Sequence, residues 1–183
     1  QLHVDLRADD VLFYFTTCGW MMWNWLATAL ASEATLLLYD GSPFYPQAKS
    51  LIDMAEQEKV SVFGASAKYI ASLEKAYVVP RETHNLENLR VLLSTGSPLS
   101  HESFEYVYRD IKADLCLSSI SGGTDIISCF VLGNPCLPVW AGEIQCLGLG
   151  MAVEIWDEDG NKMCESVYEN GDLVSTKYKY DRL

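Results

Sequence analysis

A stretch near the middle of the chain, residues 115–127, combines residue types that could bind a phosphate group. It reads L-C-L-S-S-I-S-G-G-T-D-I-I. Glycines lack Cβ, so Gly122 and Gly123 would let backbone amides approach a ligand closely. Thr124 and Asp125 follow directly, and a hydroxyl and a carboxylate beside such a turn suit a phosphate and its magnesium ion. Short Gly/Ser/Thr loops are common, however, and the stretch taken alone favours an ordinary turn with Asp125 as a solvated cap.

Apolar runs of strand type alternate with helical segments over the first two thirds of the chain. Strands are expected at 11–15, 35–39, 60–63, 89–94 and 114–117, and helices at 20–30, 47–58, 66–77 and 100–111, with Ser100 as an N-cap. This alternation predicts βαβ units, hence an α/β fold with a mainly parallel sheet and flanking helices. We expect one α/β subdomain over residues 1–135. Residues 136–183, where Gly and Pro become frequent, are expected to be a short β-rich segment that starts a following subdomain.

Three loops of the predicted sheet leave strand ends and are rich in Ser, Thr and Gly. They are residues 16–19, 94–98 and 118–125. In parallel sheets ligands bind beyond the carboxyl ends of the strands, so these loops would meet at one edge. Small residues there make room for a ligand and supply donors. Since α/β proteins generally carry small residues at strand ends, the coincidence supports a binding site without defining its ligand.

The net charge and the cysteine content indicate which partners and which cellular compartment are compatible with the sequence. The chain has 183 residues, enough for one substantial domain, and a formal net charge of −12, which argues against nucleic acid or an anionic membrane as a partner. A nucleotide in a local pocket remains compatible, because backbone amides and metal ions can bind phosphate. The six cysteines form no CxxC pair, which predicts free thiols in a reducing compartment and hence a cytoplasmic protein. The three histidines have no shared spacing that would indicate a metal site.

One apolar segment, residues 19–39, has about the length of a membrane span. Asn24, Thr28, Ser32 and Glu33 interrupt it. We therefore expect a buried helix followed by a buried strand, and no membrane span. Neither G-x-S-x-G nor G-x-x-x-x-G-K-[ST] occurs in the sequence, which gives no support to a serine hydrolase or a simple P-loop protein.

Five stretches carry a family resemblance. They read F-T-T-C-G-W-M-M-W-N-W (15–25), L-Y-D-G-S-P-F-Y-P (38–46), S-T-G-S-P-L-S (94–100), S-I-S-G-G-T-D-I-I-S-C-F-V-L-G-N-P (119–135) and G-E-I-Q-C-L-G-L-G-M-A-V-E-I-W-D (142–157). These motifs resemble the adenylate-forming acyl-CoA synthetase superfamily, and within it the enzymes that act on acetoacetate. The resemblance covers essentially the whole chain.

The resemblance implies a two-step reaction of an acid–thiol ligase. The carboxylate of acetoacetate attacks the α-phosphate of ATP bound with Mg²⁺, which gives an acyl-adenylate and pyrophosphate. The thiol of coenzyme A then displaces AMP. Residues 1–135 would be the adenylate-binding subdomain, and the small-molecule partners would be acetoacetate, ATP, Mg²⁺ and coenzyme A.

The resemblance also implies roles for individual residues. Thr124 matches the threonine at the α-phosphate, and Asp125 stands where relatives usually have the glutamate associated with magnesium, so that a shorter side chain would need a bridging water. The positions that match the nucleotide site are Gly96, Ser97 and Pro98, on the adenine, and Ser119, Ile120, Ser121 and Gly123. The positions that match the acyl pocket are Trp20, Met21, Thr95 and Gly122. Acetyl-specific relatives have tryptophan at the place of Gly122, and its loss would leave room for a four-carbon keto acid.

The family's phosphate loop, ribose-binding aspartate and C-terminal domain with its catalytic lysine have no counterpart in this sequence. We therefore expect an internal part of the large N-terminal domain that cannot complete the reaction alone. A second hypothesis fits the same observation. In it, the chain is a non-catalytic nucleotide-binding or interaction module that keeps the fold and lacks the chemistry.

Overall fold

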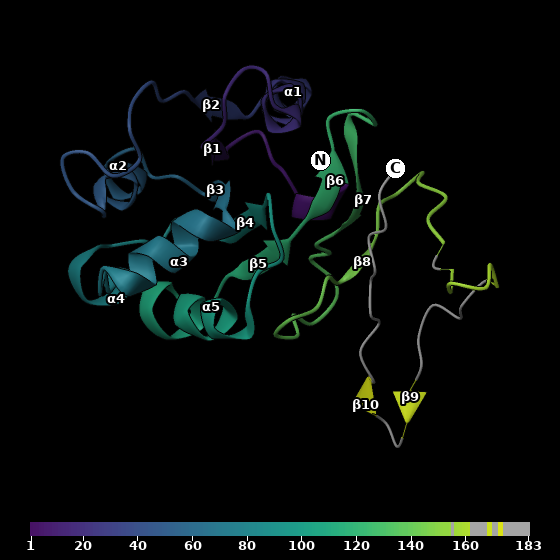
Figure 1. Ribbon diagram of the computed structural model, residues 1–183. Helices are drawn as coiled ribbons and strands as arrows, with labels where there is room; N and C mark the ends of the chain where they lie inside the picture. Colours follow the sequence, from purple (N-terminus) through teal and green to yellow (C-terminus); the bar gives the residue numbers. More distant parts are fainter. Residues whose placement is uncertain (155, 162–167, 170–171, 174–183) are drawn as a thin grey trace. The chain divides into compact units, whose positions relative to one another are not determined.

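The computed structural model describes residues 1–154, 156–161, 168–169 and 172–173, in two compact units (Figure 1). The first unit is Gln1–Leu149 and the second is Gly150–Leu183. The second contains the antiparallel pair β9 (Tyr168–Glu169) and β10 (Asp172–Leu173). The structure thus divides after Leu149, and a domain boundary after residue 135 stays a prediction.

A five-stranded parallel sheet forms the centre of the first unit (Figure 1). Its strands are β1 (Val11–Tyr14), β2 (Thr35–Leu37), β3 (Val62–Ser66), β4 (Val91–Thr95) and β5 (Cys116–Ser119), in the spatial order β2-β1-β3-β4-β5. Every pairing between neighbours is parallel. This parallel pairing confirms the predicted α/β fold. The apolar runs of the sequence indicated it, because strands of parallel sheets are typically buried on both faces.

Helices connect these strands, and all but the short α4 begin close to where the sequence predicts. They are α1 (Met21–Thr28), α2 (Ser50–Gln57), α3 (Ala67–Lys75), α4 (Pro80–Thr83) and α5 (His101–Tyr106), the last continued by a π-helical turn, Val107–Ile111. The predicted cap at Ser100 is confirmed, since its hydroxyl accepts from the Ser103 amide at 3.2 Å. Ser66 caps α3 in the same way.

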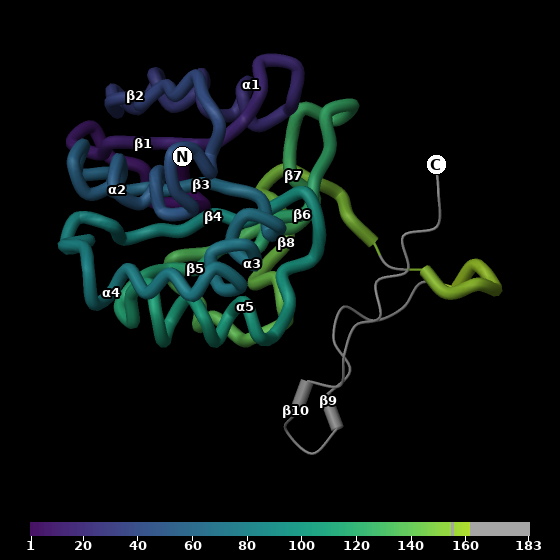
Figure 2. Tube along the Cα trace, turned by 60° about the vertical axis from the view of Figure 1, so that its left-hand side comes forward, coloured from purple at the N-terminus to yellow at the C-terminus, as the bar shows by residue number. Residues whose placement is uncertain are grey.

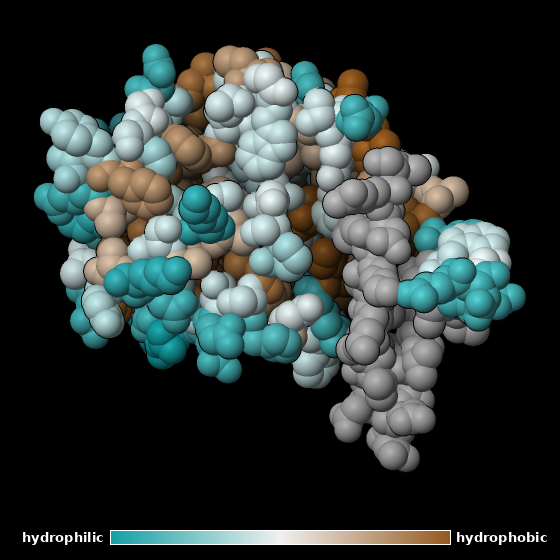
Figure 3. Space-filling model, in the orientation of Figure 1, coloured by the Kyte–Doolittle hydropathy of each residue, from teal (hydrophilic) through white to brown (hydrophobic). Residues whose placement is uncertain are grey.

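The two faces of the sheet carry separate cores. Residues of α2, α3 and α5 pack with Phe13 and Phe63 on one face. Residues of α1 and of β7 (Ser128–Leu132) pack with Tyr14 on the other, so these elements form opposite layers (Figure 2). Polar side chains gather along the lower margin in Figure 3, where α4 and α5 lie, as expected of amphipathic surface helices.

A small antiparallel sheet follows β5. It consists of β6 (Ser121–Gly123), β7 and β8 (Cys146–Leu147), in that spatial order. The long loop between β7 and β8 is closed by the Gln145 amide, which accepts from the Asn134 amide at 2.9 Å and donates to the carbonyls of Asn134 and Leu137. A β-rich part after the parallel sheet is thereby confirmed, although β6 and β7 lie within residues 1–135 and, of this small sheet, only β8 lies in the predicted segment 136–183.

The apolar segment 19–39 folds as α1, a 3-10 turn (Ala29–Ser32) and strand β2. The expected helix and strand are confirmed, but the expected burial of the strand is wrong: β2 lies at the edge of the sheet, with Thr35 exposed and Leu36 and Leu37 half-buried. Among the helices that the structure describes, none combines the length and the apolar composition that crossing a bilayer requires.

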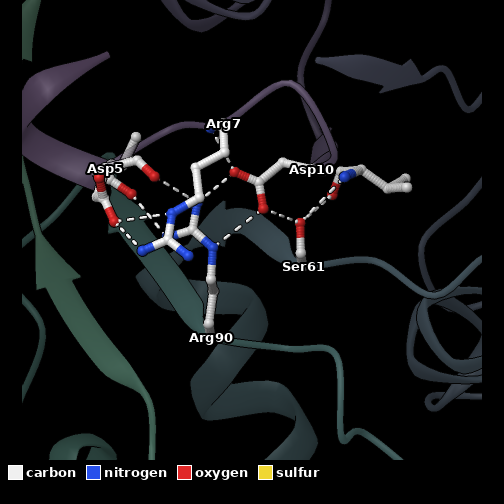
Figure 4. A network of polar contacts seen from close by, with 7 residues as sticks. Asp5, Arg7, Asp10, Ser61 and Arg90 are labelled. Atoms are coloured by element: carbon white, nitrogen blue, oxygen red, sulfur yellow. Dashed lines mark hydrogen bonds and ion pairs between the residues drawn. The ribbon is translucent and has the colours of Figure 1, made fainter.

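A buried carboxylate ties together the amino ends of β1, β3 and β4 (Figure 4). Asp10 is 4% exposed and accepts from Arg90, from the Ser61 hydroxyl at 2.7 Å and from the Arg7 amide at 2.7 Å. Arg90 also donates to the carbonyls of Val4 and Asp5, at 2.9 and 2.7 Å. The N-terminal segment is therefore fixed to the same edge of the sheet.

This hydrogen-bonding determines the protonation state of Asp10. Burial alone would raise the pKa of Asp10, but the hydrogen bonds from Arg90, Ser61 and the Arg7 amide together lower it below its ordinary value. The carboxylate is therefore charged over the whole neutral range. A buried charge of this kind is costly without its partners, so each donor to Asp10 is needed.

We predict that alanine substitution lowers stability at one buried serine and not at another. Ser61→Ala removes the hydroxyl that donates to Asp10 and accepts from the Val11 amide at 3.0 Å, and we expect a loss of about 2 kcal/mol in the free energy of unfolding. Ser94→Ala is the matched control, because its buried hydroxyl has no hydrogen-bond partner among the described residues. We expect no loss there. Urea unfolding measures both, and equal losses would contradict the assignment.

We also predict that Asp10 makes stability depend on pH in acid. A lowered pKa in the folded state stabilises the fold fully above the unfolded value, near 3.9, and the contribution is lost as pH falls through the folded pKa. The difference in unfolding free energy between the wild type and Asp10→Asn should therefore be large at pH 7 and shrink below about pH 4. Asp9→Asn, at the exposed neighbouring residue, is the control and should leave the free energy of unfolding at pH 7 nearly unchanged. A pH-independent difference for Asp10→Asn would be the contrary result.

Candidate functional site

The candidate site lies at the carboxyl ends of β3, β4 and β5. The strand register places Ser66 beside Thr95 and Ser94 beside Ser119. The Thr95 hydroxyl donates to the Ile120 carbonyl at 2.8 Å, and the Ile120 amide donates to the Ser94 carbonyl at 2.8 Å. The structure thus brings together the predicted residues Thr95, Ser119 and Ile120, because parallel strands end at a common edge.

Trp20 reaches the same edge from the loop after β1. A methyl group built on Gly96 would lie 3.8 Å from the Trp20 ring and 3.9 Å from Cβ of Ser66. Gly96 has φ of +90°, a conformation that residues with a side chain rarely adopt. The glycine therefore lets the loop after β4 turn directly against the indole. Ser97 and Pro98, in the same loop, are exposed.

Met21, the neighbour of Trp20, belongs to the core. Its side chain is 4% exposed and packs within the cluster that α1 forms with the sheet. Ser119 and Ile120 are also buried, whereas Ser121 is half-buried. The predicted residues thus range from buried to half-buried along this edge of the sheet.

The two glycines of the 115–127 stretch differ from expectation. They belong to strand β6, paired with β7, and do not form an open loop. The register shifts between Ser121 and Gly122, and a Cβ on Gly122 would lie 2.4 Å from the Ser128 carbonyl oxygen. The place where a side chain would begin is occupied by the backbone of β7. This close approach at a bulge gives Gly122 a structural requirement of its own, and its role in an acyl pocket stays a prediction.

Thr124 and Asp125 lie in the turn that joins β6 to β7. Both are exposed, and the turn is closed by the Ile127 amide, which donates to the Thr124 carbonyl at 3.1 Å. The hairpin extends from the end of β5 at the edge where α1 begins (Figure 2). Within the described residues, no group of three or more His, Cys, Asp or Glu side chains could hold a metal ion. A cation at Asp125 would need further oxygen ligands from a phosphate or water.

The cysteines of the described residues carry free thiols, and two of the three histidines make hydrogen bonds. Five cysteines are free thiols, as expected, and Cys164 lies outside the described residues. Burial raises the pKa of Cys129 to about 11, so its thiol stays protonated at neutral pH. His3 hydrogen-bonds to the Gly133 carbonyl at 2.8 Å and to the Leu149 amide at 3.0 Å. His84 lies 2.7 Å from the Asp53 carboxylate.

Two surface hollows, of about 580 and 400 Å³, lie beside the N-terminal segment and share Leu2, Pro135 and Cys136. None of the predicted site residues lines either hollow. The candidate residues instead occupy the open edge of the sheet.

Sequence reasoning missed three residues that shape this edge. Ser66 ends β3 and caps α3, Tyr14 ends β1, and the ring of Tyr14 lies over Gly64. Ser66 had a readable signal, because a serine between an apolar run and a helical pattern repeats the composition of the three predicted loops. The contact between Tyr14 and Gly64 joins residues 50 positions apart in the sequence and leaves no local pattern.

Comparison with known proteins finds relatives that match this chain over part of their length. An acetoacetyl-coenzyme A synthetase of Rhizobium meliloti (strain 1021) is 57% identical over 177 residues, which cover 97% of this chain and 27% of that protein. The structure of acetoacetyl-CoA synthetase from Streptomyces lividans matches with a TM-score of 0.83 and 40% identity, over 88% of this chain and 26% of that one. The chain is homologous to a segment of acetoacetyl-CoA synthetase. It spans about a quarter of the length of the curated relatives it matches.

A more distant likeness bears on the fold alone. An anthranilate CoA ligase in complex with anthranoyl-AMP superposes with a TM-score of 0.76 at 16% identity, over 90% of this chain and 31% of that one. Both structural matches agree that the parallel sheet, its helices and the small antiparallel sheet form part of the N-terminal domain of adenylate-forming enzymes. No family model matches the chain.

We predict that the acetoacetyl-CoA synthetase homologue tolerates a methyl group at one hairpin glycine and not at the other. Gly122→Ala forces the paired backbone of β7 apart, and we expect a loss of about 1–3 kcal/mol in unfolding free energy. Gly123→Ala is the matched control, since nothing lies within 4 Å of a Cβ there. Thermal and urea unfolding compare the two. Equal stability of both variants would refute the close approach at the bulge.

Proposed function

We propose that this chain forms part of the acyl-adenylate site of an acetoacetate–CoA ligase. One observation carries the proposal: the chain aligns over 97% of its length, at 57% identity, with an acetoacetyl-coenzyme A synthetase. The convergence of Trp20, Thr95 and Gly96 at the carboxyl edge of the sheet supports it, because this is where parallel sheets bind nucleotides.

In the proposed reaction the acetoacetate carboxylate attacks the α-phosphate of ATP, pyrophosphate leaves, and the coenzyme A thiol later displaces AMP. Thr124 donates its hydroxyl to an α-phosphate oxygen. Gly96, Ser97 and Pro98 contact the adenine, and the segment Ser119, Ile120, Ser121 and Gly123 contacts the rest of the nucleotide. Thr95 already donates its hydroxyl to Ile120, so its methyl group is the part left to contact the acyl chain. Trp20, Met21 and Gly122 complete the acyl side.

The chemistry of the donors fits a nucleotide-bound Mg²⁺. Magnesium in such sites uses one or two carboxylates together with substrate phosphates and waters, and Asp125 is a single exposed carboxylate next to the Thr124 hydroxyl. Asp125 would hold the ion through a water, since its side chain is short. The ion, when bound, neutralises charge that develops on the phosphates. Coenzyme A enters as co-substrate.

Calorimetry with two ligands tests the proposal. We expect the chain to bind a non-hydrolysable acetoacetyl-adenylate analogue, and to bind ATP in the presence of Mg²⁺. Asp125→Asn should weaken MgATP binding roughly 10-fold and leave the metal-free analogue unaffected, because only the former needs the metal contact. Glu105→Gln, at an exposed carboxylate of α5, is the control and should change neither.

The outcomes bear on the proposed site as follows. Binding of the analogue without turnover supports a half-site, as expected of an internal part that cannot complete the reaction alone. Formation of acyl-adenylate from acetoacetate and MgATP would show that the chain is catalytic by itself. No heat with either ligand would rule out the nucleotide site.

A further inference from the structure

The orientation of the Trp20 indole is defined by two contacts. The Tyr14 ring meets it edge-on, with ring centroids 6.2 Å apart and an interplanar angle of 79°. On another side, the turn at Gly96 approaches the indole. Trp20 is half-buried and immediately precedes α1. Its side chain is therefore not subject to the rotamer restriction that a helical backbone imposes. The packed ring of Tyr14 therefore limits where the indole can lie.

Tyr14 itself is held firmly. Its side chain is 3% exposed, and its ring also meets Trp25 edge-on, with centroids 6.0 Å apart. The ring lies over Gly64 of the neighbouring strand β3, where an added Cβ would come 2.1 Å from Cδ2 of Tyr14. The space that Tyr14 occupies exists because residue 64 has no side chain. The two residues form one packing unit.

Tyr14 acts here through its ring and not through its hydroxyl. The only hydrogen bond given by the hydroxyl within the described part of the chain, to the Ala65 carbonyl, is long at 3.5 Å. Burial raises the pKa of Tyr14, so the phenol stays neutral and is unsuited to proton transfer. Edge-to-face aromatic pairs have a preferred geometry, and this preference is transmitted to the indole.

We propose that Tyr14, in the space provided by Gly64, is a positioning residue that sets the orientation of Trp20 as a wall of the acyl pocket. The inference rests on the proposed function, which makes Trp20 a wall of that pocket. It adds to the proposed site a residue, Tyr14, that acts through Trp20 and does not contact the substrate itself. A substitution of Tyr14, at the buried end of β1, would therefore change the orientation of the Trp20 indole at the edge of the sheet.

Fluorine NMR of the chain labelled with fluorotryptophan tests this directly. Trp20→Phe assigns the Trp20 signal by its loss. Tyr14→Leu should shift or broaden the signals of Trp20 and Trp25, and Tyr14→Phe should leave them in place because the ring is kept. Phe13→Leu is the matched control: the residue is adjacent, fully buried and packed in the core on the other face of the sheet. It should leave the Trp20 signal unchanged.

Gly64→Ala provides a second route to the same displacement. The added methyl group pushes the Tyr14 ring without removing it, so the Trp20 signal should move again. If Tyr14→Leu does not fold, this variant decides the question. A Trp20 signal that stays in place in Gly64→Ala, or that moves no more in Tyr14→Leu than in Phe13→Leu, would overturn the inference.

Ligand binding separates this inference from the proposed function. Tyr14→Leu should weaken binding of the acetoacetyl-adenylate analogue roughly 3- to 10-fold, as expected for the loss of one aromatic contact, and Tyr14→Phe should bind as the wild type does. If the wild type binds no analogue, the proposed function fails, while the fluorine signals still decide whether Tyr14 orients Trp20. If the analogue binds equally well to the wild type and Tyr14→Leu, the positioning role is refuted.

Discussion

The charged carboxylate of Asp10 binds donors that immediately precede two neighbouring strands of the sheet. Ser61 precedes β3 and Arg90 precedes β4, while Asp10 itself precedes β1. Backbone hydrogen bonds run alongside, from the Ser61 amide to Val11 and from the Arg90 amide to Ser61. A slip of one residue in any strand would move its side chains to the opposite face of the sheet, so this anchor helps to fix the register. The register in turn decides which residues end the strands at the opposite edge.

The candidate site depends on that register and on one additional element. Ser66, Thr95 and Ser119 share an edge because the strands start together and run in parallel. Thr124 and Asp125 do not belong to these strand ends and lie in the turn of a hairpin that leaves β5. The edge is held by buried hydrogen bonds, whereas the hairpin tip is exposed. Buried hydrogen bonds thus hold Thr95 and Ile120 in place, whereas Ser97, Pro98 and the hairpin tip lie at the surface.

Local pattern was sufficient to predict the strands, most helices and the cap at Ser100, because apolar periodicity and capping chemistry act over a few residues. It was also sufficient to predict that the loops after β1 and β4 meet. It could not predict β6, since Gly122 and Gly123 have poor strand propensity and pair only because β7 returns to cover them. Nor could it predict the contact of Asp10 with Arg90, which lie 80 residues apart. What escaped prediction is pairing that local propensity does not indicate, in the β6–β7 hairpin as well as between distant segments.

The alternation of side chains along β1 has a consequence for how such a domain can change. Phe13 faces the helical layer of α2, α3 and α5, and its neighbour Tyr14 faces the opposite layer. The backbone of the sheet separates the two cores, so a side-chain substitution in one core does not directly disturb packing in the other. Packing on the α1 side of the sheet can therefore change while the layer of α2, α3 and α5 keeps its shape, because side chains of the same strand belong to two separate cores.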